Sequence, residues 1–149
     1  MGRSEARENA FQFLYELSIQ KEDREEQEGY FLESHPMSKA DLEFFRRLVD
    51  GVMDEQEKLD EMIAPKLRGW KLERLPLIDL SILRLSIFEL LHVNEVPPSV
   101  SISEAVLLAK KYSSEEARSY INAVLGGIAR EVANTSAADE SNAQDVNGI

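Results

Sequence analysis

The stretch that decides the fold reads Leu77-Ile-Asp-Leu-Ser-Ile-Leu-Arg-Leu-Ser-Ile-Phe-Glu-Leu-Leu91. Apolar side chains fall on every side of a helix here, and only Asp79, Arg84 and Glu89 carry charge. A helix that is hydrophobic all round has to be surrounded by other elements. We therefore expect residues 77–91 to form the central helix of a domain. Pro76 suits its first turn, where the missing N–H group costs nothing.

The residues before this stretch also follow helical spacing. A helix is expected over residues 4–20, because its apolar residues recur at i, i+3, i+4 and i+7. Residues 21–34 are predicted to be a charged connector or a second helix. Ser38 is expected to cap a third helix with a kink near Gly51. The stripe that predicts the first helix consists of Ala10, Phe13, Leu14 and Leu17.

Two S-x-x-E patterns, Ser101 with Glu104 and Ser113 with Glu116, predict the starts of the last two helices. The pair Gly126-Gly127 costs a helix about 1 kcal/mol per residue, which suggests that another backbone approaches closely there. Nothing in the sequence is typical of a strand. We expect an all-α fold with one compact domain over residues 1–133 and a disordered acidic tail over residues 134–149.

The composition excludes several classes of chemistry. The chain has 149 residues, of which 43% are hydrophobic, and no cysteine. A domain of this size buries roughly 68–70% of its unfolded surface, so it needs no disulfide or structural metal. Neither His35 nor His92 has a second ligand at metal-binding spacing, and no glycine-rich phosphate loop is present. We expect no cofactor and no enzymatic activity.

The charges argue against a membrane span and leave open whether the chain attracts a cationic partner. Each charge within Leu75–Leu91 would cost about 2.5–3.5 kcal/mol in a bilayer, so a soluble, cytoplasmic protein is expected. The net charge is −11, from 17 basic and 28 acidic residues. The acidity is heaviest in residues 21–33 and the tail, where it either solvates the surface or attracts a basic partner. This balance counts against the chain binding a polyanion unaided.

Polar and aromatic residues near two helix ends are candidates for RNA binding. Aromatic side chains among cations can stack bases and hold phosphates. Tyr15 and Tyr120 also have spacings that fit the edge of a core, so a structural role is the alternative. The candidates are Arg3, Arg7, Gln12 and Tyr15 near the first helix, and Lys110, Lys111, Arg118, Tyr120 and Asn122 near the last.

Several collinear motifs between Ala6 and Val132 resemble the signatures of the NusB transcription antitermination family. The motifs are Ala6-Arg-Glu-Asn-Ala10, Leu14-Tyr15, Phe44-Phe45, Leu48-Val-x-Gly51-Val, Leu59-Asp60, Trp70-x-Leu-x-Arg74-Leu-Pro, Ile78-Asp79-x-x-Ile82-Leu-Arg84, Val96-Pro, Ile102-x-Glu104-Ala-Val, Ala109-Lys110 and Tyr120-Ile-Asn122-x-Val124-Leu125.

The resemblance implies a fold of about seven helices in two helical subdomains. It also implies that the chain binds boxA RNA together with NusE, a ribosomal protein that also acts in transcription. Its place would be the RNA polymerase antitermination complex on ribosomal RNA operons. A helical adaptor or homodimer that does not touch RNA is the alternative.

The resemblance also implies roles for individual residues. Arg3 and Arg7 match an arginine-rich arm of the family. Ser4 and Glu5 stand where the family often has further arginines, so the arm has fewer cations here. Four residues match RNA-facing positions on the first and last helices, and two match an acidic surface for partner recognition. We therefore expect weaker RNA binding by the chain alone than with NusE. The RNA-facing set is Gln12, Tyr15, Tyr120 and Asn122, and the partner-binding set is Asp79 and Glu116.

Overall fold

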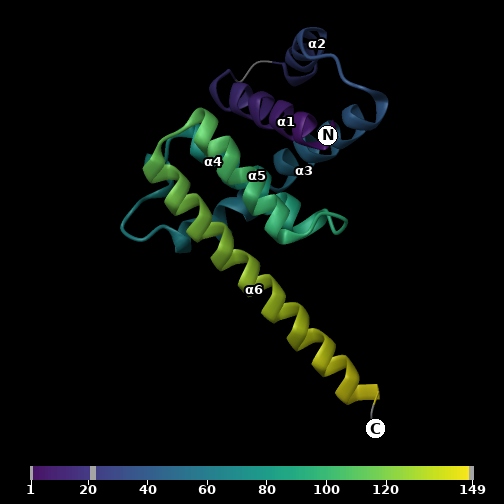
Figure 1. The fold of residues 1–149 in the computed structure, drawn as a ribbon, viewed down its shortest axis with the longest axis vertical. Coiled ribbons are helices and arrows are strands. Elements are labelled where there is room, and N and C mark those ends of the chain that lie inside the picture. The colour runs from purple at the N-terminus through teal and green to yellow at the C-terminus, as the bar shows by residue number, and fades with distance from the viewer. Residues whose placement is uncertain (1, 21–22, 148–149) are drawn as a thin grey trace.

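A computed structural model describes residues 2–20 and 23–147 of the chain. This described part contains six α-helices and two short 3-10 helices and has no strand (Figure 1). The all-α prediction is confirmed, with six α-helices where about seven were expected. The elements are α1 (Gly2–Ile19), α2 (Arg24–Ser34), α3 (Lys39–Ile63), η1 (Ala64–Lys66), η2 (Leu72–Arg74), α4 (Leu77–His92), α5 (Pro98–Tyr112) and α6 (Glu115–Asn147).

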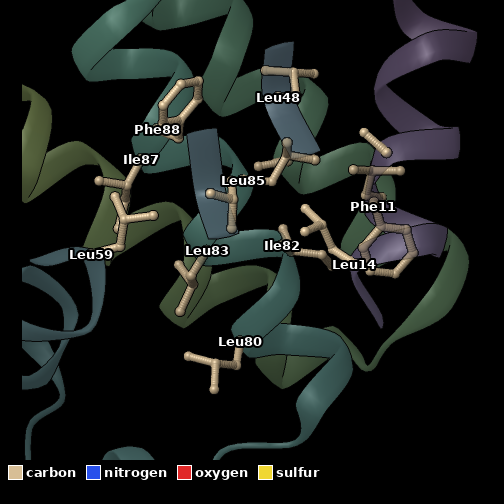
Figure 2. Close-up of a cluster of buried hydrophobic side chains, with 14 of the residues drawn as sticks. Phe11, Leu14, Leu48, Leu59, Leu80, Ile82, Leu83, Leu85, Ile87 and Phe88 are labelled. Atoms are coloured by element: carbon tan, nitrogen blue, oxygen red, sulfur yellow. The ribbon is translucent and has the colours of Figure 1, made fainter. Parts of the chain in front are cut away.

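The central position predicted for the most apolar helix is confirmed. Ten of the sixteen residues of α4 are buried. α1 and α3 pack against α4, as do α5 and α6, so α4 joins the group α1–α3 to the pair α5–α6. Figure 2 shows α4 side chains such as Ile82 and Leu85 among Phe11 and Leu14 of α1 and Leu48 of α3. Pro76 lies just before the helix, at its N-cap, rather than inside its first turn.

Each of the three charged residues of α4 is bonded to side chains of other segments. Glu89 pairs with Arg7 of α1. The guanidinium of Arg84 donates two hydrogen bonds, of 2.7 and 2.8 Å, to the carboxylate of Asp60 on α3. Asp79 accepts hydrogen bonds from side chains at and beyond the end of α5. A buried charge is tolerated only when it is paired, so these bonds specify how the helices meet.

The close contact between α3 and α4 explains Gly51. The expected kink is absent, because α3 runs without interruption from Lys39 to Ile63, and Ser38 caps it by accepting from the Asp41 N–H at 3.2 Å. A Cβ at position 51 would overlap the ring of Phe88 on α4. Glycine therefore lets the two helices approach at this point, at the usual cost in helix propensity.

The starts of the last two helices differ from the S-x-x-E predictions. α5 begins at Pro98, whose ring favours a first helical position, and Ser101 is buried inside the helix. The N-cap of α6 is Ser114, one residue after the predicted Ser113. The Ser114 hydroxyl accepts from the Ala117 N–H at 3.0 Å, while Ser113 donates to Asp79 instead.

The predicted C-terminal tail begins within the last helix of the described structure. α6 continues through residue 134 to Asn147 and extends away from the other helices (Figure 1). No proline or glycine interrupts the sequence from Ile128 to Asn147, and alanines recur along it, so helical hydrogen bonding can propagate. The last two residues of the expected tail, 148 and 149, lie outside the described residues. None of the described helices is both long and apolar enough to span a bilayer.

The contact between Gly51 and Phe88 predicts opposite effects of alanine at two glycines. Gly51→Ala should lower the free energy of unfolding by about 1–3 kcal/mol, because the added methyl group overpacks the α3–α4 contact. Gly29→Ala on α2 is the matched control, since nothing lies within 4 Å of a Cβ there. It should raise stability by about 0.5–1 kcal/mol. Urea denaturation measures both, and equal effects would contradict the packing role of Gly51.

Candidate nucleic-acid interface

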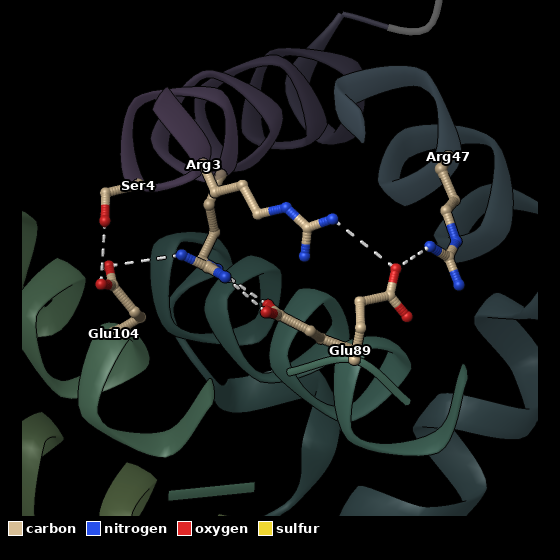
Figure 3. A network of polar contacts seen from close by, with 7 residues as sticks. Arg3, Ser4, Arg47, Glu89 and Glu104 are labelled. Carbon is tan, nitrogen blue, oxygen red and sulfur yellow. Dashed lines mark hydrogen bonds and ion pairs between the residues drawn. The ribbon is translucent and has the colours of Figure 1, made fainter. Parts of the chain in front are cut away.

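Arg7 is part of the core rather than of an RNA-binding arm. Its side chain is only 5% exposed. Its Nε donates to Glu89 Oε2 at 2.8 Å and its Nη2 to Glu89 Oε1 at 2.5 Å, while Nη1 lies 3.6 Å from Glu104 Oε2 (Figure 3). Arg7, which was predicted to hold a phosphate, is thus buried and paired with carboxylates in this structure. Arg7 lies on the same helical face as Ala10 and Leu14, so the spacing already indicated burial.

Arg3 stays at the surface near the start of α1. Its guanidinium carbon lies 4.8 Å from the centre of the Phe44 ring, and Nη2 lies 3.7 Å from Glu95 Oε1 (Figure 3). Half of the side chain is exposed. An exposed ion pair of this length is weak, so Arg3 can still meet a phosphate. Arg118, the other arginine candidate, lies 3.9 Å from the carboxylate of Glu115.

A polar cluster joins α1 to the end of α5. Gln12 Nε2 donates to the Tyr112 hydroxyl at 2.7 Å, and that hydroxyl donates to Glu8. Lys111 Nζ lies 2.5 Å from Glu8 Oε1. Burial acts to raise the pKa of the Glu8 carboxyl, but the hydrogen bonds from Lys111 and Tyr112 outweigh it and lower the pKa. Tyr112 was not among the predicted site residues, because its place on the apolar face of α5 predicts a core residue.

The two lysines predicted to contact RNA differ in whether a carboxylate of the protein already binds them. Lys111 is already neutralised by Glu8, whereas Lys110 is exposed and has no ion pair among the described residues. Tyr15 is half-buried on α1, and its carbonyl accepts a hydrogen bond from Ser18. On the surface formed by α1 and α5, Lys110 is thus a cation without an ion pair among the described residues. Its neighbours Gln12 and Lys111 already have partners within the protein.

Asp79 holds the predicted stacking residue Tyr120. Its carboxylate is 2% exposed and accepts from the hydroxyls of Ser113 and Tyr120. Burial raises the pKa of Tyr120, and the hydrogen bond to Asp79 raises it further, so the phenol stays protonated. Asp79, which was predicted to belong to a surface that binds a partner, is buried in this structure. Glu116 is exposed and remains available to a partner.

Tyr120 and Asn122 open onto a groove between α6 and the segment from Pro65 to Pro76. The groove has a volume of about 1000 Å³. Gly126 and Gly127 line it from α6. The close backbone approach expected at these glycines is absent, because the nearest atoms to a Cβ there belong to the side chains of Arg130 and Lys66.

The arrangement is typical of a binding module. Candidates from α1, α5 and α6 lie near the junction where Tyr112 and Ser113 end α5, with one cluster on each side of it. No group of three metal-ligating side chains exists in residues 3–20 and 23–135, the part of the chain whose side chains are described. A helical domain with exposed cations, tyrosines and amides at one junction has the groups that bind single-stranded nucleic acid.

The chain belongs to the NusB family, whose family model matches residues 4–130. It is 46% identical to the transcription antitermination protein NusB of Ruminiclostridium cellulolyticum over 87% of this chain and 90% of that protein. The protein of the same name from Acetivibrio thermocellus is 45% identical, with the same coverage.

Solved structures of the family share the fold. NusB of T. maritima matches with a TM-score of 0.81 and 32% identity, over 87% of this chain and 91% of that one. A chain in the crystal structure of the antitermination factors NusB and NusE in complex with dsRNA matches with a TM-score of 0.79 and 29% identity. That match covers 87% of this chain and 97% of the other.

The Arg7–Glu89 pair predicts a large loss of stability when one partner is removed. Glu89→Gln should lower the free energy of unfolding by about 3–5 kcal/mol, because it leaves a buried guanidinium without its main counter-charge. The double variant Arg7→Met, Glu89→Met should recover most of this loss. Lys111→Met, at an exposed pair, is the control and should change stability by less than about 1 kcal/mol. Chemical denaturation measures all three, and a double variant no more stable than Glu89→Gln would contradict the pairing.

Proposed function

We propose that this chain is a transcription antitermination factor that binds boxA-type single-stranded RNA together with the ribosomal protein NusE. It acts in the cytoplasm, within the RNA polymerase antitermination complex, as a binding protein and not as a catalyst. The observation that carries this proposal is the match to the NusB family over residues 4–130, joined to a fold shared with a chain solved in complex with NusE and RNA.

The distribution of charge supports a shared RNA-binding surface. The chain has a net charge of −11, and two of its predicted RNA-binding cations are neutralised internally, Arg7 by Glu89 and Lys111 by Glu8. RNA affinity depends largely on cations at phosphates. A basic ribosomal protein would supply the missing positive potential and would itself be attracted by the acidic surface, including exposed Glu116.

The remaining candidates have complementary roles in this surface. Tyr15 and Tyr120 stack on bases, at roughly 1–3 kcal/mol for each stacked base. Gln12 and Asn122 form hydrogen bonds with base edges, whereas Arg3 and Lys110 contact phosphates. Arg7 and Asp79 act indirectly: Arg7 anchors α1 on α4, and Asp79 fixes the hydroxyl of Tyr120.

The aromatic ring of Tyr120 can be tested separately from its hydroxyl. Tyr120→Ala should weaken binding to a boxA-type RNA by roughly 5- to 150-fold, the equivalent of one lost stacking contact. Tyr120→Phe keeps the stacking face and loses only the bond to Asp79, so its loss should be smaller. Fluorescence anisotropy of labelled RNA measures affinity, and circular dichroism checks that helicity is kept. Unchanged affinity for Tyr120→Ala would remove this residue from the site.

The shared-surface proposal predicts that affinity depends on the partner. The chain with NusE should bind boxA-type RNA more tightly, and with a steeper salt dependence, than the chain alone, because NusE adds phosphate contacts. A scrambled RNA of the same length and composition is the control. The measurement is RNA titration at several salt concentrations with and without NusE. Equal affinities, or failure of the two proteins to associate, would contradict the proposal.

A further inference from the structure

The groove between α6 and the Pro65–Pro76 segment differs in charge from the rest of the molecule. Residues 65–76 contain four basic residues and one acidic residue, in a chain with a net charge of −11. Four cationic side chains line the groove: Lys66, Arg68, Arg74 and Arg130. A cluster of cations that lines a concave groove on an otherwise acidic protein favours an anionic ligand.

The arginines that line this groove form no ion pair with a carboxylate among the described residues. Within the described residues, seven of the ten arginines have an ion pair. The other three are Arg68, Arg74 and Arg130, and all three are exposed and line this groove. Lys66 is the exception among the four cations, because Glu131 pairs with it. Three unpaired guanidinium groups can therefore bind oxyanions without first breaking an internal contact.

The acidic groups of the groove lie at its Tyr120 end. Asp79 and Glu116 both line the groove. Asp79 is buried and accepts from two hydroxyl groups, so its charge is partly satisfied within the protein. Glu116 remains exposed. The positive end of the groove is thus formed by the arginines and the stretch around Trp70.

Trp70 adds a large aromatic surface to the same groove. It is 55% exposed and is the only tryptophan of the chain. A tryptophan that is left open to solvent between arginines forms a platform on which a base can stack. Tyr120 and Asn122, which the proposed function already assigns to RNA, line the same groove. Continuity with these residues favours RNA over an acidic peptide as the occupant.

We propose that this groove is a second RNA-binding surface, in which a single-stranded segment outside the boxA element places phosphates on Arg68, Arg74 and Arg130 and stacks a base on Trp70. This proposal rests on the proposed function, because it extends the path of the same RNA beyond Tyr120. The glycines at positions 126 and 127 add no side chains of their own to the α6 side of the groove, so the cationic side chains of Arg130 and Lys66 can lie over the helix there.

The emission of Trp70 reports on this groove directly. The full chain is titrated with a short RNA limited to the boxA element and with a longer single strand that extends it on both sides. Labelled-RNA anisotropy shows saturation in each case. The longer RNA should bind more tightly and quench the tryptophan emission, whereas the short RNA should leave the emission nearly unchanged. Trp70→Ala should weaken binding of the longer RNA about fivefold or more and leave the short RNA unaffected.

The arginines are tested by salt dependence. Arg68→Gln with Arg74→Gln should lower the salt slope for the longer RNA by about 1.4 units, at roughly 0.7 for each lost contact with a single strand. Arg46→Gln with Arg47→Gln is the matched control, because it removes the same charge from exposed, ion-paired arginines on α3 outside the groove. This control should leave the slope unchanged.

The outcomes separate the two proposals. If the short RNA binds but the longer RNA gains no affinity and does not quench Trp70, the groove proposal is overturned and the proposed function stands. Equal slopes for the two double variants, or quenching by NusE without RNA, would also overturn it. If neither RNA binds with or without NusE, both proposals fail. Stronger binding of a matched duplex than of the single strand would overturn the assignment to single-stranded RNA.

Discussion

The burial of α4 together with its three charges is the constraint on which the rest of the structure depends. Glu89 is held by α1, Arg84 by α3, and Asp79 by Ser113 and by Tyr120 of α6. Apolar burial alone is non-directional, so it would let the surrounding helices slide and rotate. A buried charge destabilises the fold unless a partner lies at the right distance and orientation to pair with it. We infer that these bonds select the arrangement of helices that the apolar core then fills.

This arrangement also determines which polar groups remain for other molecules. The bond to Glu89 draws Arg7 into the core, and Lys111 is occupied by Glu8. The bond to Asp79, in contrast, holds the hydroxyl of Tyr120 while its ring stays part of the groove wall. The three unpaired arginines, Arg68, Arg74 and Arg130, line the same groove. An acidic protein can in this way offer a local cationic path for RNA while its remaining surface attracts a basic partner.

The differences between the predicted and the observed site have physical causes. The resemblance implied surface roles for Arg7 and Asp79, and each is buried here because a partner far along the chain satisfies it. The net charge of the chain does not reveal the basic cluster at Lys66, Arg68 and Arg74, because acidic residues on either side offset it. A shorter window around Trp70 reveals the basic cluster from the sequence.

The sequence by itself determined the helices and their central member, because apolar spacing, capping groups and prolines act within a few residues of the chain. The motifs from Ala6 to Val132 likewise sufficed to indicate the family. Only the tertiary structure decided which charges are neutralised and which face outward, because the partners of Arg7 and Asp79 lie 82 and 41 residues away. The groove depends on such distant contacts too, since its walls, α6 and the Pro65–Pro76 segment, come together only in the folded structure.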